Sequence, residues 1–297
     1  MTRELKNLAK GLQFLEGPRW HEGRLYASDF YLRRIIAFDE DGRGELICEV
    51  PGQPSGLGFD RDGRLLISSM NDRQVLRLGD EGLETVARLD RLAGGPVNDM
   101  TVDGQGRAYV GNFGSDLDAG DPIRPTVLVR VDPDGTSTVV ADDLVFPNGT
   151  PITPDGRTMV VAESFAFRIS AFDIDADGGL SNRREWARFG DPPAELTLDA
   201  VLAADPVIPD GMVMDAEGAV WVADARNRGV LRVREGGEIV DHVDLGEDTG
   251  YAVALGGADG RTLFITAAPP LGQIDPKEHH RSSLWSCRVD VPGIGWD

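Results

Sequence analysis

A recurring unit first occurs as Trp20-His21-Glu22-Gly23-Arg24-Leu25-Tyr26-Ala27-Ser28-Asp29. It consists of an apolar strand, an acidic turn that ends in glycine, and a second strand with alternating apolar residues. Later copies occupy residues 59–68, 102–112, 152–163, 214–224 and 255–266. Repetition of a small unit along a chain is typical of solenoids, propellers and related arrays, so this repeat decides the fold class.

A second strand pair follows the unit, again joined by a turn rich in aspartate and glycine. In the first repeat, residues 34–39 lead through Glu40-Asp41-Gly42 into residues 45–50, and later pairs span 75–89, 127–140, 169–189 and 230–245. Such alternation around glycine turns is typical of antiparallel hairpins. The sequence predicts an all-β fold, a six-bladed β-propeller with four antiparallel strands per blade, formed by residues 1–297 as one domain.

The sixth repeat lacks a fourth strand of its own. Its third strand, residues 283–289, is followed only by the short, Pro- and Gly-containing segment 290–297, whereas residues 2–10 precede the first inner strand and have no place in the first repeat. We therefore expect the N-terminal segment to pair with the last blade as its outer strand. This pairing would close the ring and remove an open sheet edge.

Polar residues recur at one phase of the repeats. Glu16 lies seven residues before the turn glycine Gly23, and the later members each lie eight residues before theirs. These later members are Ser55, Asn98, Asn148 and Asp210. In a propeller, each of these residues would lie at the start of an innermost strand and face the central axis. A single polar residue there can simply hydrogen-bond to neighbouring backbone, but several at one phase favour a shared site.

Four of these residues carry a carboxylate or amide oxygen, namely Glu16, Asn98, Asn148 and Asp210. Oxygen-only ligation suits Ca²⁺, Mg²⁺ or Mn²⁺ better than zinc, which prefers nitrogen and sulfur ligands. The pattern thus predicts a hard-cation site on the axis. Water or substrate would complete its shell, which is what metal-assisted hydrolysis requires.

The charge of the chain limits its partners. Fifty acidic and thirty basic residues give a formal net charge of −20, which opposes binding to nucleic acid or anionic lipid. The first residues carry charges where a signal peptide needs an apolar core, and no run approaches the roughly 20 apolar residues of a membrane span. We expect a cytoplasmic protein with a small-molecule substrate. Cys48 and Cys287 lack the spacing of a zinc site or a disulfide framework.

Other motifs give weaker evidence for a catalytic or binding site. There is no Gly-x-Ser-x-Gly elbow, and residues 173–178 open like an EF-hand loop but place Arg184 where a glutamate ligand belongs, which favours a hairpin turn. The connections 111–125 and 190–209 are long enough to be binding lids or surface excursions. Aromatic residues near the expected mouth are Phe30, Tyr31, Phe113, Phe146, Phe165, Phe167 and Tyr251. We expect most of them to pack between blades and two to line a pocket.

The chain resembles the senescence marker protein, gluconolactonase and luciferin-regenerating enzyme family, which includes regucalcin. The resemblance extends over nearly the whole chain and rests on four places. These are Leu15-Glu16-Gly17-Pro18-Arg19-Trp20, Val97-Asn98-Asp99 followed by Asp103-Gly104-Gln105-Gly106-Arg107, Phe146-Pro147-Asn148-Gly149 followed by Pro154-Asp155-Gly156, and Pro209-Asp210-Gly211-Met212.

The resemblance implies a six-bladed propeller with one divalent cation, bound by the residues matching Glu16, Asn148 and Asp210. It implies that Asn98 contacts substrate and that Asp210 is also the catalytic general base. Many family members hydrolyse lactones, with calcium or zinc at the site. Calcium is therefore the first expectation here, with Zn²⁺, Mn²⁺ and Mg²⁺ as alternatives.

One position departs from the family pattern. Sugar lactonases of this family commonly carry an arginine two residues before the asparagine that matches Asn98, whereas this chain has Pro96. The departure argues against an aldonolactone and for a more apolar pocket shaped by the two long connections. The resulting hypothesis is a metal-dependent lactonase. An isomerase, hydratase or lyase that uses the same cation, or a non-catalytic ligand-binding propeller, remains open at this point.

Overall fold

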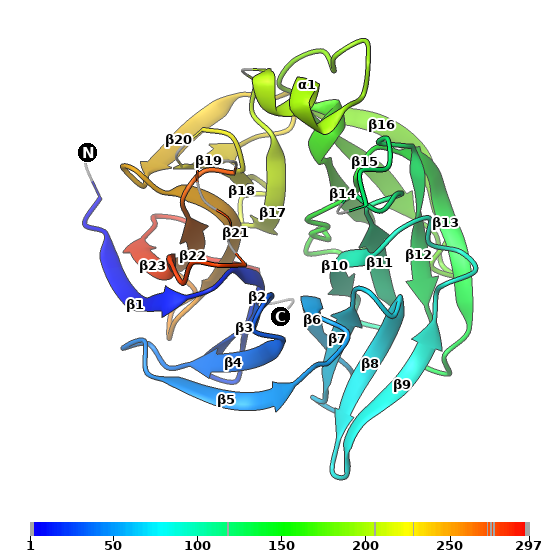
Figure 1. The fold of residues 1–297 in the computed structure, drawn as a ribbon, viewed down its shortest axis with the longest axis horizontal. Helices are drawn as coiled ribbons and strands as arrows, with labels where there is room; N and C mark the ends of the chain where they lie inside the picture. The colour runs from blue at the N-terminus through cyan, green and yellow to red at the C-terminus, as the bar shows by residue number, and fades with distance from the viewer. Residues whose placement is uncertain are drawn as a thin grey trace.

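The computed structural model describes residues 3–117, 119–204, 206–227, 229–271, 273, 275 and 277–294. Within this part of the chain, six antiparallel sheets are arranged radially around a central axis (Figure 1). Blade 1 contains β2 (Leu15–His21), β3 (Arg24–Asp29), β4 (Arg34–Phe38) and β5 (Gly44–Glu49). Blade 2 contains β6 (Pro54–Phe59), β7 (Leu65–Ser69), β8 (Gln74–Gly79) and β9 (Gly82–Arg88). The predicted six-bladed propeller is confirmed.

The next three blades continue in chain order. Blade 3 contains β10 (Val97–Val102), β11 (Ala108–Asn112), β12 (Thr126–Val131) and β13 (Ser137–Leu144). Blade 4 contains β14 (Thr158–Glu163), β15 (Arg168–Ile174) and β16 (Leu180–Arg188). Blade 5 contains β17 (Pro209–Met214), β18 (Val220–Asp224), β19 (Gly229–Val233) and β20 (Ile239–Asp244).

The innermost segment of blade 4 is not a regular strand. It joins β14 through isolated bridges between Pro147 and Glu163 and between Ile152 and Met159. Pro147 and Pro151 have no N–H to donate to a ladder, so prolines interrupt the regular pairing here. The segment still occupies the inner position, because Asn148 N–H donates to the carbonyl of Ala162 at 2.9 Å.

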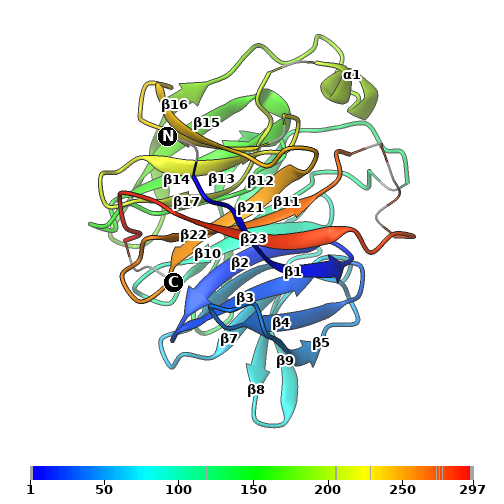
Figure 2. The ribbon, with the colours of Figure 1, turned by 90° about the vertical axis from the view of Figure 1, so that its left-hand side faces the viewer.

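The N-terminal strand closes the ring as predicted. β1 (Lys6–Leu12) pairs antiparallel with β23 (Ser282–Arg288), outside β22 (Thr262–Ala268) and β21 (Thr249–Gly256), and Figure 2 shows β1 alongside β23. Lys6 faces Ser286 and Lys10 faces Ser283 in this register. The segment expected to pair begins at Thr2, which lies outside the described residues. The first and last parts of the chain therefore share blade 6.

The acidic turns explain the recurrence of the repeat. In blade 2 the Asp60 carboxylate accepts hydrogen bonds from the backbone N–H groups of Asp62 at 3.0 Å and Arg64 at 2.9 Å. Gly63 has φ +76°, a conformation that favours glycine. Asp39, Asp103 and Asp215 accept the same pair of hydrogen bonds in blades 1, 3 and 5. Each of these four turns therefore has aspartate at its start and glycine three residues later.

The core lies between blades. In the described part of the chain, each junction of neighbouring blades holds one cluster of buried apolar residues, such as Ile35, Leu57 and Ile67 between blades 1 and 2. A seventh cluster lies at one end of the axis and is described with the site. Cys48 and Cys287 are free, and burial raises the pKa of each thiol to about 11. This fits their predicted role as small strand hydrophobes.

The long connection 190–209 contains a short helix, α1 (Leu198–Ala203), where the sequence shows only an apolar run. Thr197 caps it, since its hydroxyl accepts a hydrogen bond from Ala200 N–H at 3.2 Å. Val201 is fully buried and holds the helix against the end of the propeller. Figure 2 shows α1 at the same face as the connection between β22 and β23. Helices long and apolar enough to cross a bilayer are absent from the described ranges.

Blade 4 also contains a buried carboxylate, Glu163, whose side chain is fully buried. It accepts hydrogen bonds from Arg168 at 2.9 Å, Ser170 at 2.5 Å and Arg183 at 2.7 Å. Burial alone would raise its pKa, but the hydrogen bonds from Arg168 and Ser170 outweigh burial and lower it. The ionised form is thus stabilised in the fold.

Replacing Glu163 by Gln is expected to lower the free energy of unfolding by roughly 3 kcal/mol at neutral pH, because it leaves two arginines without their buried partner. The depressed pKa means that this stabilisation is present above the pKa of an unfolded glutamate, about 4.3, and is lost as the pH falls through the lower native value. Urea denaturation at pH 7 measures the loss. The control is Glu185→Gln in the exposed pair with Arg188, which should stay within about 0.5 kcal/mol. Equal effects of both variants would contradict the assignment.

Candidate active site

A cavity of about 260 Å³ lies on the propeller axis, at the face that carries α1. Five of its lining residues come from the innermost segments of five consecutive blades, and they are Glu16, Ser55, Asn98, Asn148 and Asp210. Blade 6 contributes Tyr251 from β21. The structure therefore brings all four predicted site residues to one cavity. Their roles as ligands, base and substrate contact stay predictions.

Irregular strand pairing accompanies these residues. The registers of the inner strands shift between Glu16 and Arg19, between Pro54 and Leu57, between Val97 and Met100, and between Pro209 and Met212. A β-bulge bends a strand and re-aims its side chains, and bulges are common next to active sites. The shared position of these shifts explains why the polar residues keep one phase in the sequence.

Glycines let the inner strands approach one another. A Cβ at Gly17 would lie 2.5 Å from the carbonyl oxygen of Ser55, and a Cβ at Gly211 would lie 2.5 Å from the Cβ of Ala252. Gly17 also has φ +53°. Any larger residue at these two positions would push neighbouring inner strands apart, so the glycine that follows Glu16 and Asp210 is required by close packing at the axis.

The two carboxyl groups of the site, Glu16 and Asp210, have raised pKa values. Burial, followed by repulsion from Asp210 and Asp99, raises the pKa of Glu16 well above its ordinary value. Burial and repulsion from Asp99 raise the pKa of Asp210 to about 8, although hydrogen bonds from Asn148 and from Gly211 N–H act in the opposite direction. Both carboxyl groups therefore ionise with difficulty unless positive charge is supplied.

A cation fits this set of donors. No Lys, Arg or His is found among the described residues that line the cavity. Nor do the described residues contain a group of three His, Cys, Asp or Glu side chains placed to hold a metal. A bound cation would have to rely on the carboxylates of Glu16 and Asp210 and on amide oxygen. That combination of hard oxygen donors suits Ca²⁺ or Mg²⁺ better than a softer metal.

Hydrogen bonds orient the amides of Asn98 and Asn148. Asn98 Nδ2 donates to the carbonyl of Pro147 at 3.3 Å, and Asn148 Nδ2 lies 3.4 Å from the Ser164 hydroxyl. Ser164 in turn donates to the carbonyl of Pro209 at 2.7 Å, which links blade 4 to blade 5. Since these contacts use the nitrogen ends, the carbonyl oxygen of each amide is the end left to act as ligand or acceptor.

The Asp99 carboxylate lies behind the site and was not proposed as a site residue from the sequence. It is buried and accepts hydrogen bonds from Arg19 at 2.9 Å and from Met100 N–H at 2.8 Å. Its charge contributes to the raised pKa values of both Glu16 and Asp210. The signal was its place directly after Asn98, at the innermost strand, but sequence spacing could not show that Arg19 would reach it from two blades away.

The expectation that only two of the named aromatic residues line a pocket was wrong. Six line the cavity, and they are Phe30, Tyr31, Phe113, Phe146, Phe165 and Tyr251. Only Phe167 of that group is fully buried away from it. Four of these residues come just after the second strands β3, β11 and β14, Phe146 precedes the inner segment of blade 4, and Tyr251 lies within β21. All six cluster over the axis on the α1 face rather than between blades. Phe14, which the sequence did not single out, and Pro96 line the same cavity.

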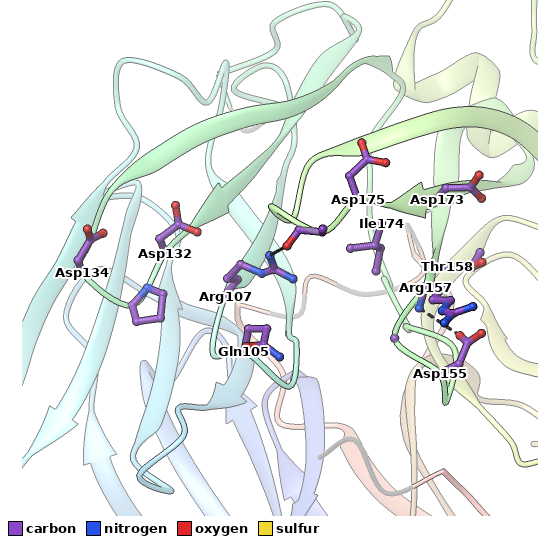
Figure 3. Close-up of a pocket in the computed structure, with 13 residues that line it drawn as sticks. Gln105, Arg107, Asp132, Asp134, Asp155, Arg157, Thr158, Asp173, Ile174 and Asp175 are labelled. Carbon is purple, nitrogen blue, oxygen red and sulfur yellow. Dashed lines mark hydrogen bonds between the residues drawn. The ribbon is translucent and has the colours of Figure 1, made fainter.

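A second hollow is larger and more open, at about 1140 Å³, and lies on the surface between turns of blades 3 and 4 (Figure 3). Its carboxylates lie in or next to hairpin turns and accept hydrogen bonds within the protein. Asp155, for example, accepts hydrogen bonds from Thr153 and from Arg157 N–H. The EF-hand-like stretch lies here and is the turn between β15 and β16, with Gly178 N–H donating to the carbonyl of Asp175 at 2.8 Å. The predicted hairpin turn is confirmed.

A family model and several known proteins are similar in sequence to this chain. The family model described as the SMP-30/Gluconolactonase/LRE-like region matches residues 14–269. The chain is 31% identical over 258 residues to the pentonolactonase XacC of Haloferax volcanii, covering 85% of this chain and 81% of that protein. It is 26% identical over 293 residues to the 6-deoxy-6-sulfogluconolactonase of Pseudomonas putida, covering 94% and 92%.

A solved structure shares the architecture. The crystal structure of a calcium-binding protein, regucalcin, from Agrobacterium tumefaciens superposes with a TM-score of 0.78 at 20% sequence identity, covering 99% of this chain and 96% of that one. At this identity the likeness concerns the fold alone. The match of the family model over most of the sequence is the stronger finding, and it shows that this chain belongs to the SMP-30/gluconolactonase/LRE-like family.

Proposed function

We propose that this protein hydrolyses a cyclic ester, a lactone, with one divalent cation held by Glu16, Asn148 and Asp210. The observation that carries the proposal is the pair of carboxylates with raised pKa values in an axial cavity whose described lining contains no basic side chain. Relatives named as a pentonolactonase and a sulfogluconolactonase support the reaction class. The hard oxygen donors favour calcium, with magnesium, manganese and zinc as alternatives.

When bound, the cation would polarise the lactone carbonyl and lower the pKa of a nearby water. Residues of the chain transfer the protons. Asp210, which must be ionised to hold the cation, accepts a proton from the water that attacks the carbonyl carbon. The ring C–O bond then breaks, and Asp210 returns the proton to the departing ring oxygen. The product is a hydroxy acid.

Asn98 positions the substrate in this proposal. Its amide nitrogen carries two hydrogens, of which one is directed to the Pro147 carbonyl. The second can donate to the carbonyl or ring oxygen of the lactone. Because Asn98 is only 3% exposed and tied to the next blade, it offers that hydrogen bond from a fixed position.

The proposal is tested by assaying sugar, aliphatic and aromatic lactones, with linear esters as controls, using metal-stripped protein to which Ca²⁺, Mn²⁺, Mg²⁺ or Zn²⁺ is returned in turn. Lactone turnover that depends on the added metal is the expected result. Tight cation binding without turnover of any lactone would refute the hydrolase proposal. Such a result would favour an isomerase, hydratase or lyase reaction at the same centre, or ligand binding alone.

Cation binding is expected to release protons. At pH 7 the Asp210 carboxyl, with a pKa of about 8, is mostly protonated in the metal-free protein and must ionise to bind a cation. Calcium affinity should therefore rise with pH from neutral pH to at least about 8. Calorimetry in two buffers of different ionisation enthalpy measures the protons released; Asp210 contributes most of one proton at pH 7, and Glu16, whose pKa is also raised, adds to it. An affinity independent of pH below 8 would contradict this.

A further inference from the structure

The cavity wall beyond the polar site consists mostly of aromatic and aliphatic side chains. Phe113 and Phe146 stack with their ring centroids 4.4 Å apart, and Phe146 and Phe165 lie 4.3 Å apart with a 32° tilt. The three rings come from the connection after β11 in blade 3, the entry of blade 4 and the short helix η1 (Ser164–Ala166). Phe146 lies two residues before Asn148, so this aromatic wall adjoins the proposed cation site.

Leucines from two connections complete the apolar lining. Leu198 and Leu202 lie four residues apart on α1, hence on one face of the helix, and both line the cavity. Leu271, from the connection between β22 and β23, joins them. Leu198 is 39% exposed and Leu271 is 44% exposed, although large apolar side chains are usually buried. An apolar ligand seated in the cavity would cover both.

The polar side chains of the cavity are largely engaged within the protein. Asn98 donates to the Pro147 carbonyl, and Ser164 donates to the Pro209 carbonyl. At the rim, Asn71 donates to the Gln53 side chain at 3.2 Å. A polyhydroxylated ring needs a partner for each buried hydroxyl, and each unpaired one costs binding free energy. The wall offers such a ring few partners outside the carboxylate centre.

From these observations we propose that the substrate is a lactone bearing an alkyl or aryl substituent. The ring lies at the Glu16 and Asp210 carboxylates, and the substituent packs between the wall formed by Phe113, Phe146 and Phe165 and the leucines of α1. The inference rests on the proposed function for the ring, and on the apolar wall for the substituent.

The test is a matched series of δ-lactones with the same ring, assayed with metal-loaded protein. The series contains the unsubstituted ring, the ring with a pentyl or phenyl group, and a polyhydroxylated ring. We expect kcat/KM for the substituted lactones to exceed that of the other two by about 10-fold or more, since one methylene in an apolar pocket already discriminates by about 10-fold.

Two variants locate the substituent. The combined variant Leu198→Ser, Leu202→Ser should lower the preference for substituted over unsubstituted lactone by roughly 10-fold. The matched control is Leu46→Ser on β5, which replaces a 54% exposed leucine remote from the cavity and should leave the preference unchanged. A preference that survives the α1 variants would overturn the assigned position of the substituent.

Binding of the corresponding δ-lactams, which hydrolyse far more slowly, separates failure of this inference from failure of the proposed function. Equal or better hydrolysis of the unsubstituted or polyhydroxylated lactone would overturn the inference and leave the lactonase proposal standing. Tighter lactam binding with the apolar group, but no lactone hydrolysis, would support the apolar subsite and overturn the hydrolase proposal. Failure of every lactam to bind and every lactone to react would overturn both.

Discussion

Asp210→Asn is expected to lower kcat for lactone hydrolysis by about 10³-fold or more. The substitution preserves the shape of the side chain but removes the proposed base, whose contribution in enzymes is typically 10²–10⁴-fold, and one of the two anionic cation ligands. Calcium affinity should fall as well. Hydrolysis of the preferred lactone and calcium binding by calorimetry measure the two effects separately.

The stability of the same variant excludes unfolding as the cause. The raised native pKa of Asp210 means that its ionisation destabilises the metal-free fold as the pH rises from the unfolded value of about 4 to about 8. Above pH 8, metal-free Asp210→Asn should therefore be at least as stable as the parent protein. Thermal unfolding in the presence of a chelator measures this. Lower stability would point to a structural role instead.

Asp116→Asn is the matched control for Asp210→Asn. Asp116 lines the mouth of the same cavity but is exposed, on the connection that follows β11, and its carboxylate accepts a hydrogen bond from Ala119 N–H. The control removes the same charge without touching the inner strands, and activity should change by less than about 3-fold. Full lactonase activity in Asp210→Asn would refute the proposed base and ligand.

Deletion of residues 1–10 is expected to destabilise the whole propeller by at least about 3 kcal/mol. The deletion removes most of β1, and each ladder hydrogen bond to β23 contributes about 0.5–1.5 kcal/mol net. It also removes Arg3, which pairs with Asp241 of blade 5 at 2.6 Å, and the apolar contact of Leu8 with the cluster between blades 1 and 6. The exposed edge of β23 would favour aggregation.

Thermal and urea unfolding of the truncated chain measure this loss, and a peptide of residues 1–10 added in trans should restore part of it. Lys10→Thr is the control, because it changes an exposed side chain of β1 and keeps the strand. An unchanged melting temperature after deletion would show that β1 does not close the ring.

The sequence predicted much of this protein because the propeller is built from local hairpins. The Asp-x-Asp-Gly turns satisfy their hydrogen bonds within a few residues, as at Asp60, so their recurrence is visible without tertiary structure. The alignment of Glu16, Asn148 and Asp210 was equally visible, because each lies seven or eight residues before a turn glycine. Ring closure by the N-terminal segment followed from counting strands.

The remaining features depend on contacts between distant blades, which no local pattern encodes. Prolines in the entry of blade 4 broke the expected regular strand, and Arg19 of blade 1 reached Asp99 of blade 3. The aromatic residues turned toward the mouth rather than between blades, because α1 and the connection before β23 cover that face and supply Val201 and Leu271 as partners. The sequence by itself thus determined the repeat, the fold and the polar residues of the axis. Tertiary structure decided the raised pKa values and the apolar wall, because burial and repulsion depend on which blades meet.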